Sequence, residues 1–146
     1  MADVSQLRLN VLRAYYLLIA LERGYRLIAR LAGGGEPLGP WDGTAYAFWG
    51  GLAFLALLGL RYPLHMLPLL LLHLAYKTIW LLVVALPLCL AGAAFDATTT
   101  AFTWAMAVGV LLDLLIIPWG YVIANYVRQP GKPWRTAGGR SGPAVP

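Results

Sequence analysis

Residues 63–91 read PLHMLPLLLLHLAYKTIWLLVVALPLCLA, an apolar run that is interrupted near its centre only by His73 and Lys77. The run is longer than the about 20 residues that an α-helix needs to cross the hydrocarbon core of a membrane. Because backbone polar groups in lipid must be paired within the segment, we interpret it as a transmembrane helix and not as a strand. Pro63 is expected in its first turn, and Pro68 and Pro87 are expected to kink it.

The rest of the chain contains three further apolar windows, so that the expected spans are about 9–31, 44–60, 63–91 and 98–127. Hydrophobic residues make up 60% of the chain and charged residues 12%, and the mean hydropathy is +0.70. Soluble domains have about 45–50% apolar and about 25% charged residues. We therefore predict an all-α fold, an integral membrane bundle of four transmembrane helices that forms one domain over residues 1–128. The hydroxyls of residues 98–100 are expected to cap the fourth helix, and the Gly- and Pro-rich residues 129–146 are predicted to form a flexible cytoplasmic tail.

The positive charges predict how the chain is oriented. Seven basic residues fall on one side of the expected spans: Arg8, Arg13, Arg61, Arg128, Lys132, Arg135 and Arg140. The opposite loops carry Glu36, Asp42 and Asp96. The positive-inside rule then places both termini in the cytoplasm. The net charge of +5 fits attraction to anionic lipid headgroups, and the chain lacks the long basic stripe that nucleic-acid binding needs. The expected partner is thus the lipid bilayer.

Five ionisable residues inside the expected spans form a predicted intramembrane cluster: Glu22, Arg26, His73, Lys77 and Asp113. At about 1.5 Å per residue, Glu22, His73 and Asp113 lie at one depth on three different helices. A charge at the bilayer centre costs roughly 2.5–3.5 kcal/mol on insertion scales, so these groups are expected to face inward and to pair. We predict that Glu22 pairs with Arg26. Lys77 is predicted to form an ion pair with Asp113 or Glu22, with His73 within one turn of that pair.

Three roles for this cluster are open at the level of sequence. It can be a structural connection that fixes helix register, with about 0.6 kcal/mol per contact. It can be a proton relay or a site for a small polar solute, because histidine titrates near neutral pH. In the third case, the first helix tilts and its arginines extend to the outer surface.

The residue content of the chain disfavours a metal site, a haem site and a serine nucleophile. One cysteine, two histidines and scattered carboxylates do not supply a metal site of the usual spacing. His65 and His73 lie on the same expected helix, which disfavours a bis-histidine haem. The two serines, Ser5 and Ser141, lie in the termini, which disfavours a serine nucleophile in the bundle. We therefore predict no catalytic residue, metal or cofactor, and an enzyme is the less favoured class.

Three segments resemble a family of small four-helix bacterial inner-membrane proteins. They are LNVLRAYYLLIA (residues 9–20), GLRYPLHMLPLLLLHLAYKTIWLLVVALP (residues 59–87) and IPWGYVIANYVRQPGKPWR (residues 117–135). The resemblance covers about half of the chain and implies a multi-pass protein of the bacterial inner membrane, but no activity. The chain departs from the pattern at His73, where the family has an acidic residue, and at 22–26, where the family's first helix is apolar. Glu22 is hypothesised to replace the carboxylate that is missing at position 73.

These observations predict a small membrane accessory or interaction protein, with self-association among its expected contacts. The alternative is a minimal transporter or channel-like protein that uses the intramembrane cluster. The two differ in one structural property. A transporter requires a water-accessible polar cavity that reaches His73 and Asp113, whereas an accessory protein can bury both side chains away from water.

Overall fold

The computed structural model describes residues 4–34, 36–92 and 94–130, and every regular element in these ranges is helical. In chain order the elements are α1 (Gln6–Ala32), α2 (Pro40–Arg61), α3 (Leu67–Trp80), the π-helical η1 (Leu81–Ala85), α4 (Leu86–Leu90), α5 (Ala97–Ile116), α6 (Trp119–Val122) and the π-helical η2 (Ile123–Val127). The predicted all-α fold is therefore confirmed for the described part of the chain. Residues 131–146, which include Lys132, Arg135 and Arg140, lie outside it, so the flexible tail stays a prediction.

Three helical segments are long and apolar enough to cross a membrane: Pro40–Arg61 with 22 residues, Leu67–Leu90 with 24 and Ala97–Ile116 with 20. The second of these is the continuous rod of α3, η1 and α4. Helix α1 has 27 residues, but charged side chains from Arg8 to Arg30 occur along its whole length. The apolar character of the first expected span is thus weaker than that of the other three.

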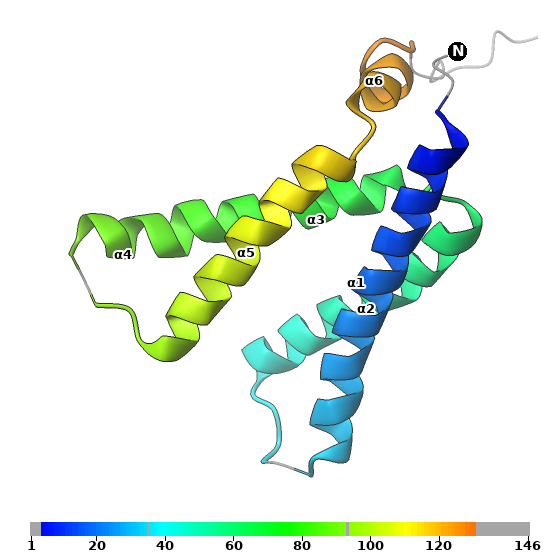
Figure 1. The fold of residues 1–146 in the computed structure, drawn as a ribbon. Coiled ribbons are helices and arrows are strands. Elements are labelled where there is room, and N and C mark those ends of the chain that lie inside the picture. Colours follow the sequence, from blue (N-terminus) through cyan, green and yellow to red (C-terminus); the bar gives the residue numbers. More distant parts are fainter. Residues whose placement is uncertain (1–3, 35, 93, 131–146) are drawn as a thin grey trace, which may run out of the picture.

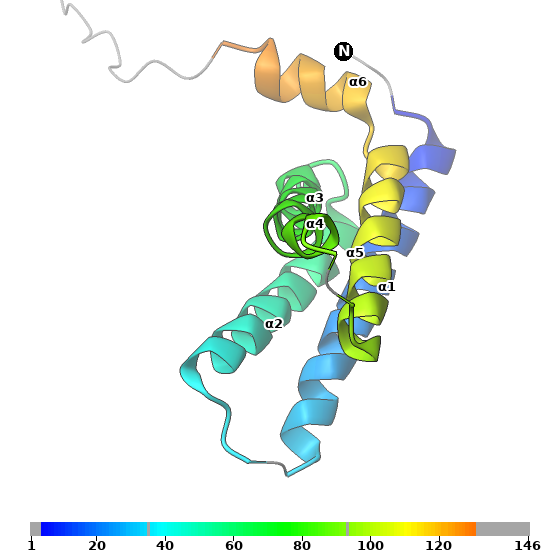
Figure 2. The ribbon, with the colours of Figure 1, turned by 90° about the vertical axis from the view of Figure 1, so that its left-hand side faces the viewer.

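The helices form two closely packed pairs, α1 with α2 and α3 with α5. Figure 1 shows α1 and α2 running in opposite directions as a hairpin. The rod of α3, η1 and α4 crosses the other helices steeply, and Figure 2 shows it end-on while α1 and α5 stand upright. The four long segments therefore cross one another, and the arrangement is more open than a bundle of parallel helices.

Small residues allow α1 and α2 to approach closely. Gly50, Ala53, Ala56 and Gly59 recur at every third position of α2. A Cβ atom added at Gly59 would lie 2.5 Å from Cγ of Tyr16, and one added at Gly50 would lie 2.8 Å from Cδ2 of Leu27. Small residues at such crossings are typical of helix pairs in membranes, where close packing replaces the hydrophobic effect.

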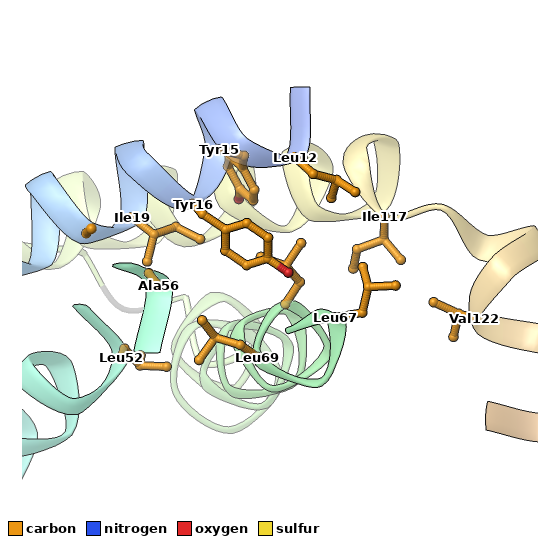
Figure 3. Close-up of a cluster of buried hydrophobic side chains, with 12 residues drawn as sticks. Leu12, Tyr15, Tyr16, Ile19, Leu52, Ala56, Leu67, Leu69, Ile117 and Val122 are labelled. Atoms are coloured by element: carbon orange, nitrogen blue, oxygen red, sulfur yellow. The ribbon is translucent and has the colours of Figure 1, made fainter. Parts of the chain in front are cut away.

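The apolar core lies where the first half of α1 meets α2, the start of α3 and the residues that follow α5 (Figure 3). Tyr16 is fully buried there, and its hydroxyl donates a hydrogen bond to the backbone carbonyl of Pro63 at 3.0 Å. Leu12, Leu67 and Ile117 surround it and are also fully buried. This core fixes the two helix pairs relative to each other next to the ionisable residues.

The fourth expected helix is shorter than predicted. Helix α5 ends at Ile116, and Ile117 is extended, with φ −61° and ψ 125°. A residue that precedes proline is driven out of the helical region by the proline ring, and Pro118 follows. The helix starts at Ala97, within one residue of the prediction, but its cap was assigned wrongly. The N-cap is Asp96, whose side chain accepts a hydrogen bond from the backbone N–H of Thr99 at 2.7 Å.

The prolines of the third expected helix also differ from the prediction. The helix begins at Leu67, so that Pro68 and not Pro63 occupies its first turn. Pro68 therefore starts the helix and does not kink it. Pro87 has no N–H to donate to the carbonyl one turn earlier, and the turn before it, Leu81–Ala85, widens to π-helical hydrogen bonding.

The first and second helices begin earlier and end later than expected, at 6–32 and 40–61. Pro40 occupies the first turn of α2, a position where its missing N–H costs nothing.

We predict that Gly59→Ala lowers the stability of the protein, because the added methyl group would overlap the buried ring of Tyr16. Overpacking of this kind costs typically about 1–3 kcal/mol. Gly51→Ala is the matched control, since a Cβ atom there has nothing within 4 Å and alanine favours a helix by about 1 kcal/mol over glycine. Thermal unfolding in detergent measures both variants. If both are equally or more stable than the parent, the close packing of Tyr16 on Gly59 is wrong.

Candidate functional site

A fully buried carboxylate joins three helices. Oδ1 of Asp113, on α5, accepts a hydrogen bond from the hydroxyl of Tyr15 of α1 at 2.6 Å and lies 3.1 Å from Nδ1 of His73 of α3. Its Oδ2 accepts a hydrogen bond from Nζ of Lys77 of α3 at 3.0 Å. We call Tyr15, His73, Lys77 and Asp113 the Asp113 cluster. Each of its side chains is buried, and both carboxylate oxygens are paired.

Helical spacing explains how these groups meet. His73 and Lys77 are four residues apart, so they share one face of α3. Gly109 lies one turn before Asp113 on α5, and a Cβ atom added there would lie 2.5 Å from Nζ of Lys77. The absence of a side chain at position 109 therefore leaves room for the lysine to extend along α5 to the carboxylate.

The imidazole of His73 has two competing partners. Its Nδ1 lies 3.0 Å from Nζ of Lys77 and 3.1 Å from Oδ1 of Asp113. A ring nitrogen carries either a proton or a lone pair. With the proton on Nδ1 the ring donates to Asp113, and without it the ring accepts from the Lys77 ammonium. The two hydrogen-bond patterns differ by the position of one proton.

A second set of polar groups lies beside the Asp113 cluster, and we call Glu22, Arg23, Arg26 and Tyr76 the arginine group. Both arginines pair with Glu22: Nε of Arg23 lies 2.9 Å from Oε2, and Nε of Arg26 donates a hydrogen bond to Oε1. Nη2 of Arg23 donates to the hydroxyl of Tyr76 at 2.7 Å. The guanidinium of Arg23 also lies 5.4 Å from the ring centre of Trp49, within cation–π range.

Arg23 is incompletely satisfied despite these contacts. Its side chain is only 9% exposed, and its Nε has no hydrogen-bond partner among the described residues. The carboxylate of Glu22 is close enough for ionic attraction, but it does not lie along the N–H bond. The Nε atom is enclosed, so its close partner among the described residues is the carboxylate of Glu22, through ionic attraction.

Two adjoining cavities between α1 and α5 connect the two sets of residues. The inner cavity, of about 240 Å³, is bordered by Tyr15, Arg23, His73 and Lys77. The outer cavity, of about 470 Å³, is bordered by Arg23, Arg26 and the first turns of α5. Both also share Glu22 and Ala105, and we call them together the α1–α5 cleft.

The cleft follows α5 from Ala97 to Leu112, a length of about 22 Å at the rise of an α-helix. Figure 1 shows α1 and α5 diverging toward the start of α5. The cleft therefore runs from the N-terminal end of α5 to His73 and Lys77, and Asp113 lies beyond it.

In the structure the five predicted site residues lie in two separate groups. The predicted ion pair of Lys77 with Asp113 is present, His73 contacts both partners, and Glu22 pairs with Arg26 and not with Lys77. Helix α1 does not carry all its arginines to the surface, because Arg23 is buried.

Sequence reasoning missed Tyr15 and Tyr76, and it predicted Gly109 as a close-packing position but not as part of the site. Helical spacing could have found them. Tyr15 precedes Glu22 by seven residues, Tyr76 follows His73 by three, and Gly109 precedes Asp113 by four.

Within the described ranges, no group of three or more His, Cys, Asp or Glu side chains could hold a metal ion. Comparisons of the chain with protein-family models, with curated proteins and with solved structures found no match. The Asp113 cluster and the α1–α5 cleft are therefore the features that indicate a function. The resemblance to inner-membrane proteins stays a prediction.

We predict strong coupling between Lys77 and Asp113. Lys77→Met or Asp113→Leu alone leaves a buried charge without its partner, which costs about 3–5 kcal/mol, whereas the double variant removes both charges and recovers much of the loss. Thermal unfolding of the four proteins in detergent measures the coupling. Asn10→Leu with Arg13→Met is the control cycle, because these side chains form an exposed hydrogen bond near the start of α1 and should show little coupling. Additive effects of the Lys77 and Asp113 changes would contradict the ion pair.

Proposed function

We propose that the protein is a polytopic protein of a bacterial inner membrane, with four passes and both termini in the cytoplasm. The three apolar segments support this proposal. At 1.5 Å per residue the rod from Leu67 to Leu90 is about 36 Å long, against a hydrocarbon core of about 30 Å. That excess allows the rod to tilt in the bilayer.

Helix α1 qualifies as the fourth pass because of how its side chains are distributed. It packs antiparallel to α2, so a bilayer that contains α2 also contains most of α1. Leu18, Leu21, Tyr25 and Ile28 are exposed on α1 and would contact lipid. Arg23 is buried, and the arginine group keeps the charges of Glu22 and Arg26 paired.

We further propose that the protein is a minimal transporter or channel-like protein, in which the α1–α5 cleft admits a proton or small ion to the Asp113 cluster. The observation that carries this proposal is the extension of the cleft to His73 and Lys77. It meets the requirement for a cavity at His73 but not at Asp113, which has no exposed surface and contacts the cleft only through His73 and Lys77. A cluster that only connected helices would need no route leading to it. The two proton positions available to His73 are the property that a relay requires.

The second candidate is the accessory or interaction protein that the sequence alone favours. One observation supports it. Asp113 has no exposed surface and both of its oxygens are paired within the chain, as expected of a structural connection between helices. The two candidates differ in whether the purified protein moves ions.

We predict that the loop before α2 and the C-terminal tail lie on opposite sides of the membrane. The native Cys89, which is exposed, is first replaced by Ala, and single cysteines are then placed at Gly39 and Gly142. A membrane-impermeant maleimide applied to oriented vesicles should label Gly39→Cys from the outside and Gly142→Cys only from the inside. Labelling of both from the same side would exclude the four-pass topology.

We also predict that the protein conducts protons in liposomes. Under an imposed potential, an internal pH-sensitive dye should respond faster with the protein than in protein-free liposomes. His73→Gln and Asp113→Asn should reduce the rate toward that of protein-free liposomes, because each removes a group that exchanges protons. Arg30→Gln, a change outside the cleft, is the control and should conduct like the parent. A parent protein that conducts no faster than lipid alone would favour the accessory role.

A further inference from the structure

We propose that the outer part of the α1–α5 cleft, between Arg26 and the first turn of α5, is a binding site for an oxyanion of the phosphate or carboxylate class. The suggestion that this oxyanion is a transported solute rests on the proposed function. Binding of the oxyanion depends only on the residues around the cavity and is tested separately.

Two guanidinium groups share one carboxylate at the border of the outer cavity. Arg23 and Arg26 carry two positive charges there and Glu22 carries one negative charge. The carboxylate of Asp96, at the N-cap of α5, lies just beyond this border and offsets the difference. An oxyanion between Arg26 and the start of α5 would therefore be stabilised mainly by charge-assisted hydrogen bonds and less by net charge.

Arg26 has the donors that such an anion needs. Among the described residues its only hydrogen bond runs from Nε to Glu22, so the two terminal amino groups of the guanidinium are available. The side chain is about half exposed and borders the outer cavity. The planar guanidinium fork matches a carboxylate or phosphate with two parallel hydrogen bonds.

The start of α5 borders the same cavity through Ala97 and Thr98. Their backbone N–H groups have no acceptor within the helix, and the positive end of the helix dipole favours an anion there. The carboxylate of Asp96 is already engaged as the N-cap. The hydroxyl and then the backbone N–H of Thr99 lower the pKa of Asp96, so this cap is ionised at neutral pH and offsets part of the dipole.

Arg23 contributes a positive charge that is independent of the helix end. It borders both cavities and its side chain is more than nine-tenths buried. Its Nε is enclosed 2.9 Å from Oε2 of Glu22 and its Nη2 donates to Tyr76, so it would act on an anion through its charge. Two arginines and a helix N-terminus thus face one cavity of about 470 Å³, a volume typical of small-molecule sites.

The walls of this cavity restrict the ligand further. Phe102 and Met106 border it on the side of α5. A site with cationic donors and apolar walls suits an oxyanion that carries an apolar portion. A free organic anion and the headgroup of an anionic lipid share this chemistry.

Isothermal titration of the full-length protein in maltoside detergent, with inorganic phosphate and with butyrate at constant ionic strength, tests the site. We expect saturable binding by the parent and a loss of about tenfold or more in Arg26→Gln, because charge-assisted hydrogen bonds are removed. Arg30→Gln removes the same charge from the same helix but lies outside the cleft, and it should bind like the parent. Arg26→Lys should be intermediate, since it keeps the charge and loses the fork. Absence of saturable binding, or equal losses in Arg26→Gln and Arg30→Gln, would overturn the proposal.

Nanodiscs separate the two sources of the anion. If phosphate binding persists in phosphatidylcholine nanodiscs with and without phosphatidylglycerol, the ligand is a free solute. If phosphatidylglycerol abolishes phosphate binding, and native mass spectrometry finds that lipid retained by the parent and Arg30→Gln but not by Arg26→Gln, the ligand is a lipid headgroup. Both results support an oxyanion site.

The anion site and the transport function can be contradicted separately. Arg26-dependent binding without proton flux would leave the site in place and remove the proposed transport function. Proton flux without anion binding would do the reverse.

Discussion

The ion pair between Lys77 and Asp113 is the interaction on which the rest of the arrangement depends. Helix α3 packs on α5 through it, and Tyr15 brings α1 to the same carboxylate. The two helix pairs, α1 with α2 and α3 with α5, otherwise share few contacts outside the apolar core near Tyr16. A buried charge pair can be retained because a displaced helix would leave a charge unpaired, which is far more costly than a lost apolar contact. The ion pair therefore specifies which surfaces of α3 and α5 meet, and the hydrogen bond from Tyr15 joins α1 to the same carboxylate.

Two glycines make the close contacts possible, each in a different way. Gly59 leaves space for the ring of Tyr16, and Gly109 leaves space for the side chain of Lys77. In the first case the missing side chain allows an apolar interface between α1 and α2. In the second it allows a long cationic side chain to lie against the backbone of α5. The apolar core and the Asp113 cluster thus have the same requirement. In each, a large side chain packs against a glycine of the neighbouring helix.

Much of the helical content and one central contact were predictable from the sequence, because they depend on local pattern and on a strong energetic demand. Lengths of apolar sequence predict helices, and a buried lysine must find a carboxylate. Other features depend on three-dimensional packing. The end of α5 at Ile117 requires weighing Pro118 against a strongly apolar run, and the steep crossing of the rod is not encoded in periodicity. Tyr15 and Tyr76 resemble ordinary core aromatics until a partner is placed beside their hydroxyls. The α1–α5 cleft exists because two helices diverge, and no single helix shows this.

The π-helical turn at Leu81–Ala85 has a geometric consequence for the rod that contains His73 and Lys77. One such turn is equivalent to a single inserted residue, and each residue of an α-helix advances the side chains by about 100° around the axis. The side chains after the turn are thus out of phase with those before it. The rod is thus one uninterrupted helical segment in two parts. The ion pair fixes the rotation of the part before the π-helical turn about the helix axis, and the part after the turn is rotated relative to it.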